Sequence, residues 1–210
     1  MPRINNALLA VAVLAAAPAL FVGCATPAYK KGDSTASAMR NSESAADALL
    51  MAAQNAQTYF TSMSGGDLKA LFPRFEKEVA AFDSGAKRMT SSIAEVRASA
   101  KGYIDSLVKT QSAIENESLK AQTQLRIDRI SEELSQIDGL AASVESLSAE
   151  LSKSFSDVRT FLSADLSARA LRDAGGMWKN VDATIARLGT AVTDLKRELA
   201  DVQTAISSDA

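Results

Sequence analysis

The chain has 210 residues, a formal charge of −2 and no histidine. Its 23 Lys and Arg against 25 Asp and Glu leave no basic excess of the kind that binds nucleic acid. Without imidazole, His-based catalytic triads and the Glu-x-x-His di-metal sites of some helical bundles are excluded. Aromatic residues make up only 5 %, with 10 Gly and 4 Pro, which is typical of helical proteins. We expect no enzymatic activity, no cofactor and no metal site.

The first predicted element is an export signal in residues 1–23. Arg3 precedes an almost wholly apolar run, residues 7–22, which Pro18 interrupts. The run is shorter than the roughly 20 residues that cross a bilayer, and it is typical of a cleaved secretory signal. Cys24, the only cysteine of the chain, follows directly. A charge, an apolar run, a small residue and a cysteine in this order indicate a bacterial lipoprotein signal.

Two processing routes fit the signal. Cleavage before Cys24 would leave its thiol to carry lipid, whereas an ordinary signal peptidase would cut after Ala25 and discard the cysteine. Phe21 departs from the Leu that lipoprotein signals usually have there. We favour lipidation, because a sole cysteine behind Val22-Gly23 is rare by chance, and two or more acyl chains give stable membrane anchoring. Ala25, in place of Asp, favours the periplasmic face of the outer membrane in the bacterial cell envelope.

Residues 24–38 are predicted to be an extended tether, because Pro27, the Lys30-Lys31 pair and Gly32 interrupt any regular pattern. At about 3.3 Å per residue, such a tether would lift the following domain roughly 30–45 Å off the bilayer. Residues 39–210 are then the folded domain.

The folded domain carries apolar residues at alternating steps of three and four in four successive seams. The seams begin at Ala46, Leu68, Ile127 and Leu171. A 3.5-residue period held over so many heptads predicts left-handed coiled-coil packing of helices. The seam of an oligomer has the same period, so that self-association into a homo-oligomer stays open.

The four seams are out of phase with one another, and each break coincides with residues that end or cap helices. These are Gly65-Gly66-Asp67, Asn116 with Ser118, and Asp165 or Ser167. Short turns make neighbouring helices antiparallel. The predicted fold is all-α: an elongated antiparallel four-helix coiled-coil bundle with up-down-up-down order.

Two local features allow alternatives. Pro73 lies either in the first turn of the second helix, where Pro is tolerated, or at a kink of the rod. Gly175-Gly176 lies inside the fourth seam, where each glycine costs up to about 1 kcal/mol relative to alanine. Either a short helix ends there and a long one begins at Met177, or the pair forms a hinge.

Aromatic residues gather at the end of the rod opposite the tether. At a rise of about 1.5 Å per residue, every ring of the helical segments except Tyr103 falls within about 25 Å of that end. Either the rings fill a wider part of the core, or they form a tip that binds a partner, because aromatic residues are enriched at interfaces. Candidate tip residues are Tyr59, Phe72 and Phe161, and Trp178, on a seam, is expected in the core.

Two turns carry a family resemblance. The first contains Gly65-Gly66-Asp67-Leu68, and the third lies between Phe161-Leu162 and Leu166-Ser167-Ala168-Arg169-Ala170. In these motifs and in helix order, residues 42–206 resemble a bacterial family of predicted coiled-coil lipoproteins catalogued as a domain of unknown function. Where that family tends to have Lys-His-Asn, this chain has Ser163-Ala164-Asp165, so no histidine role carries over. The resemblance implies no activity.

These observations together predict a lipid-anchored periplasmic rod that acts by contact with a protein partner. The alternative is a helical bundle that holds a lipid or another apolar ligand at its aromatic, membrane-distal end. Exposed rings at that end would favour the first function, and an internal cavity would favour the second.

Overall fold

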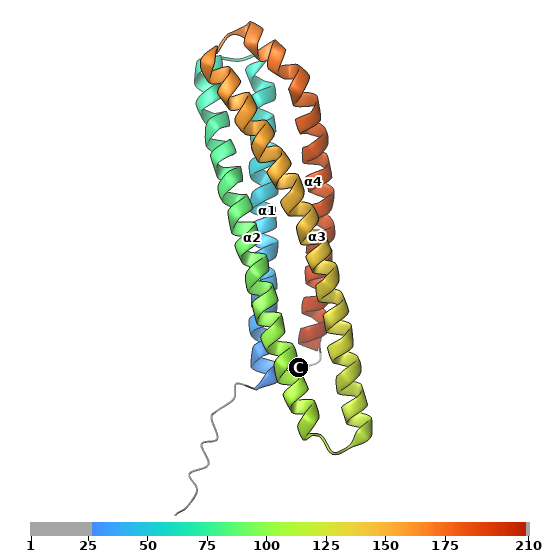
Figure 1. The fold of residues 1–210 in the computed structure, drawn as a ribbon. Helices are drawn as coiled ribbons and strands as arrows, with labels where there is room; N and C mark the ends of the chain where they lie inside the picture. Colours follow the sequence, from blue (N-terminus) through green and yellow to red (C-terminus); the bar gives the residue numbers. More distant parts are fainter. Residues whose placement is uncertain (1–26, 209–210) are drawn as a thin grey trace, which may run out of the picture.

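The structure, a computed structural model, describes residues 27–208. This part of the chain consists of four long helices, which are α1 (Ala28–Met63), α2 (Leu68–Ala113), α3 (Glu117–Ala164) and α4 (Ala168–Ser208). They run alternately up and down in an elongated bundle (Figure 1). α1 packs on α2 and α4, and α3 packs on the same two helices, so that each helix has two neighbours. The predicted all-α bundle is confirmed.

The caps at the turns explain where three of the helices begin. Asp67, Asn116 and Ser167 each accept hydrogen bonds from backbone N–H groups two or three residues later, at 2.9–3.4 Å. These N–H groups have no partner within their own helix, and a capping side chain is worth about 1 kcal/mol. The turns therefore lie at the positions that the sequence predicts.

The predicted seams form the core of the bundle. Every seam residue of α1 from Ala46 to Met63 is buried, and so is every seam residue of α4 from Leu171 to Ile206. The seams of α2 and α3 are buried in the same way over most of their length, with Ala86 and Leu134 half-buried. Apolar burial along the whole rod is thus the main source of stability.

α1 and α2 are the most closely packed pair of helices. The seam of α1 is rich in alanine, and the facing position on α2 is Gly85. A Cβ atom at Gly85 would lie 3.3 Å from the Cα of Leu49, which is tighter than ordinary van der Waals contact. Small side chains therefore let the two backbones approach each other.

The predicted tether is wrong over Ala28–Ala38, which form the first turns of α1. Gly32 is buried there, at a point where a Cβ atom would lie 3.1 Å from Ile206 and 3.5 Å from the ring of Tyr103. Contacts with α2 and α4 thus stabilise a segment with weak helix propensity. Residues 1–26, with the predicted signal and Cys24, lie outside the described residues.

Two other local expectations are decided by the course of the helices. α4 runs without a break through Gly175 and Gly176, so that of the two alternatives the helix start at Met177 is wrong, and the hinge stays a prediction. Pro73 is the sixth residue of α2 and lies beyond its first turn. Since proline has no N–H, the carbonyl of Lys69 lacks its usual helical partner, yet α2 continues to Ala113.

Gly175→Ala and Gly176→Ala should each stabilise the bundle by up to about 1 kcal/mol, because alanine loses less conformational freedom in a helix. A Cβ atom at either position meets no atom within 4 Å. Gly85→Ala is the matched control, and its contact with Leu49 should cancel the gain. Denaturant unfolding measures all three variants. Equal stabilisation at Gly85 would contradict the close packing of α1 on α2.

Candidate functional site

Six aromatic rings from all four helices pack together at the end formed by the first and third turns. The ring of Phe60 stacks on Trp178 with centroids 3.7 Å apart and an interplanar angle of 8°. Phe82 and Phe155 meet edge to face at 5.2 Å. All six side chains are buried: Phe60, Phe72, Phe75, Phe82, Phe155 and Trp178. The cluster is therefore a filled core, stabilised by ring contacts as well as by burial.

The indole of Trp178 carries a cost within this cluster. Its Nε1 is buried and has no hydrogen-bond partner among the described residues. An unpaired buried donor costs about 1–3 kcal/mol. The stacked ring and its burial must outweigh this cost, which identifies Trp178 as a packing residue, as its place on the seam predicts.

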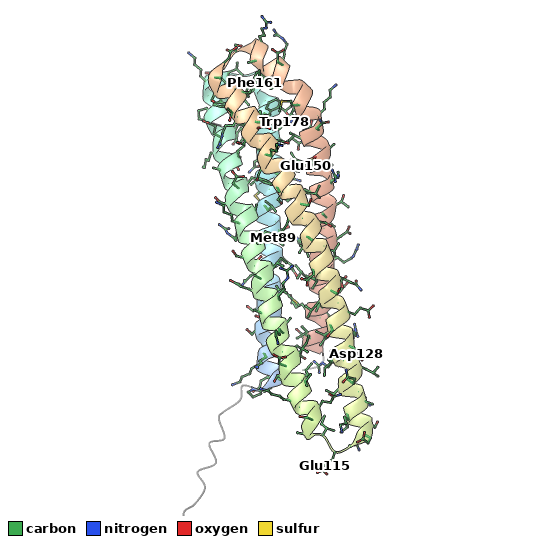
Figure 2. The ribbon with its side chains drawn as sticks, viewed as in Figure 1. Met89, Glu115, Asp128, Glu150, Phe161 and Trp178 are labelled. Atoms are coloured by element: carbon green, nitrogen blue, oxygen red, sulfur yellow. The ribbon has the colours of Figure 1, made fainter. Side chains whose placement is uncertain are left out.

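The three predicted tip residues differ in exposure. Phe161, next to the buried seam residue Leu162, is 44 % exposed. Tyr59 is half-buried against the core, and Phe72 is only 7 % exposed, so that Phe72 is a core residue and cannot meet a partner. Figure 2 shows Phe161 at the end of the bundle opposite Glu115. A contact surface at the aromatic end therefore depends on Phe161, with Tyr59 beside the core.

Several surface hollows lie along the rod, and the sequence analysis predicted none of them; two lie between different pairs of helices. One, of about 580 Å³, lies between α1 and α4, where Gln57 donates to Asp182 at 2.9 Å. The other, of about 320 Å³, lies between α2 and α3, beside the Arg97–Asp138 ion pair at 2.7 Å. Its apolar lining consists of Val96, Ile104, Leu134 and Ile137. Seam periodicity does not reveal such hollows, because they depend on how far apart two helices lie.

Exposed apolar side chains also occur at the opposite end of the bundle. Val108 is 47 % exposed, Leu119 53 %, Leu125 69 %, and Tyr29, at the start of α1, 56 %. All four lie off the predicted seams. Apolar residues that lie outside every seam could have predicted this surface from the sequence. The sequence analysis followed only the seams and did not predict it.

The charged residues lie mainly on the surface, where ion pairs contribute little to stability. Lys196 binds Asp47 at 2.6 Å and links α4 to α1.

The carboxyl group of Glu198 has a raised pKa. Burial raises this pKa, the negative charges of Asp201 and Glu133 raise it further, and the positive charge of Arg197 lowers it in part.

Within residues 27–208, no group of three or more His, Cys, Asp or Glu side chains could hold a metal ion. None of the four described helices is both long and apolar enough to cross a membrane.

Residues 33–208 match the family described as "Protein of unknown function (DUF2959)". The chain belongs to this family. The match covers the whole described bundle apart from residues 28–32 at the start of α1, and it confirms the resemblance to a domain of unknown function. No curated protein and no solved structure matches the chain.

Phe72→Ala should destabilise the bundle by about 3–5 kcal/mol, because it opens a cavity in the ring cluster. Phe161→Ala should change the stability by less than about 1 kcal/mol, because the ring is largely at the surface. Denaturant unfolding of both variants measures the difference. An equally large loss at Phe161 would show that its ring is core and would remove the contact surface.

Glu198→Gln should raise the melting temperature at neutral pH, because the folded bundle disfavours the charged carboxylate. As the pH falls through the raised pKa of Glu198, the wild-type side chain takes up a proton and its penalty disappears. The two proteins should therefore have the same melting temperature at acidic pH. Glu132→Gln, at an exposed position of α3, controls for the change in net charge. A difference that does not depend on pH would contradict this account.

Proposed function

We propose that this protein is a lipid-anchored periplasmic rod that holds a protein partner at a set distance from the outer membrane and does no chemistry itself. Cys24 carries the lipid, and the aromatic end of the bundle contacts the partner. The absence of histidine from the chain and its nearly balanced charge agree with action by contact.

The observation that carries this proposal is the start of α1 at Ala28, four residues after Cys24. With so short a connection, the bundle itself spans the distance from the anchor to the far end. From Ala28 to Met63, α1 is about 50 Å long at 1.5 Å per residue. Phe161 lies at the end of the bundle that α1 reaches at Met63, so that a partner bound there is held far from the lipid.

The alternative, an apolar ligand held among the rings, has less support. The Phe60 and Trp178 rings lie in direct contact, and Phe75 packs edge-on against Trp178 at 5.8 Å. A ligand at this end would have to displace buried rings. The hollow between α2 and α3, lined in part by Val96 and Ile137, has a largely apolar lining, but it lies away from the aromatic end.

The test is photo-crosslinking in cells from position 161 of the lipidated protein. A photo-reactive residue in place of Phe161 should capture one defined partner, and the same residue in place of exposed Gln136, midway along α3, should not. Cys24→Ala should abolish fatty-acid incorporation and, with the rod released from the membrane, weaken the capture.

Failure of the wild-type protein to incorporate labelled fatty acid would contradict the anchor. Identical capture patterns from positions 161 and 136 would contradict the contact end, because a solvated side of the rod would then bind as well as the tip.

A further inference from the structure

The α2–α3 hairpin extends past the start of α1 (Figure 1). The Nζ of Lys31 donates to the carbonyl oxygen of Gly102 at 3.2 Å, which sets α1 and α2 side by side at this level. From there α2 continues for eleven residues to Ala113, whereas α1 goes back only three residues to Ala28. At 1.5 Å per residue, the hairpin therefore reaches about 12 Å beyond α1. We call residues 106–122 the overhang.

The overhang has a defined structure of its own. Gln111 donates to the Oε1 of Gln124 at 2.8 Å and to the carbonyl oxygen of Lys120 at 3.3 Å, which ties α2 to α3. Above it, the Arg126 guanidinium donates to the hydroxyl of Tyr103 and lies 5.7 Å from the centre of that ring. Polar contacts thus hold the overhang together, and its apolar side chains are left for another contact.

Apolar exposure is concentrated at this end of the described residues. Of the seven large apolar side chains that are exposed, four lie here, namely Tyr29, Val108, Leu119 and Leu125. In addition, Ile114 and Leu119 line a hollow of about 460 Å³ at the turn. Leu119 and Leu125 are six residues apart and point about 120° away from each other around α3. A partner protein would cover one face of α3, whereas a lipid surface would surround the whole end of the hairpin. The different directions of Leu119 and Leu125 therefore favour lipid.

The length of the chain before α1 brings this end to the membrane. The four residues from Cys24 to Ala28 span at most about 13 Å. Because the overhang already takes up about 12 Å of that distance, its helical part would reach about the level of an acylated Cys24. The turn at residues 114–116 extends further still.

We propose that the overhang inserts into the headgroup layer of the membrane that carries the lipid anchor, with Ile114 and Leu119 as the inserted side chains. This inference rests on the proposed lipidation of Cys24. Interfacial protein segments bury their apolar side chains about 5–10 Å into this layer. The overhang has two lysines, Lys109 and Lys120, and two glutamates, Glu115 and Glu117. Because these charges balance, the overhang would contact the membrane through its apolar side chains, and high salt should not release it from the membrane. Inserted in this way, the overhang would hold the rod upright on the membrane.

The experiment uses the full-length lipidated protein in phosphatidylethanolamine–phosphatidylglycerol vesicles. Leu119→Cys, Leu125→Cys and Phe161→Cys each provide a single free thiol, because Cys24 is acylated, and each thiol carries an environment-sensitive fluorophore. Phospholipids brominated near the headgroup should quench the fluorophore at position 119 strongly, that at 125 less, and that at 161 not at all. All three positions are exposed, so that labelling should leave the fold intact.

Equal, unquenched fluorescence at all three positions, with fatty-acid incorporation intact, would overturn the insertion and leave the anchor standing. Quenching at position 119 that high salt abolishes would also overturn it, because the contact would then be electrostatic. If the protein incorporates no fatty acid, the anchor fails first, and the insertion that rests on it fails too.

Discussion

The close packing of α1 on α2 determines most of what is distinctive in this bundle. Gly85 lets the backbone of α2 approach Leu49, and Gly32 lets the start of α1 lie against Tyr103. These contacts fix the register of the two helices. Since α2 is 46 residues long and α1 only 36, a fixed register leaves the surplus length of α2 at one end. The overhang is a consequence of this register.

The two ends of the rod differ in a way that matters for contact. At the aromatic end the large rings meet inside the bundle, with Phe60 stacked on Trp178, and Phe161 and Met177 are the large apolar side chains left exposed there. At the opposite end, formed by the turn between α2 and α3, only two helices remain, and two helices cannot bury all of their apolar side chains. Leu119, next to this turn, is exposed for that reason. The partner contact that we propose at the first end and the lipid contact that we propose at the second would use these two different surfaces.

Periodicity and capping chemistry were enough to predict the four helices and their turns, because both are local in sequence. Phe72 lies on a predicted seam and Phe161 does not. The seams alone would therefore have placed the Phe72 ring in the core and the Phe161 ring at the surface. The helical start of α1 was missed because Gly32 disfavours a helix locally, whereas packing on α2 and α4, near Tyr103 and Ile206, stabilises one. Continuity through Gly175 and Gly176 was missed in the same way, since the buried side chains of Ala174 and Trp178 hold both flanks in the core.

The central claim is that the rod begins at Ala28, four residues after the proposed anchor at Cys24. Its most direct test is the distance between spin labels at Asp33 and Thr61, which are exposed positions near the two ends of α1. A continuous helix between them predicts one narrow distribution near 42 Å, from 28 steps of about 1.5 Å. A broad distribution would show that residues 28–38 are a flexible tether, and it would contradict both the helical start of α1 and the proposed position of the overhang at the membrane.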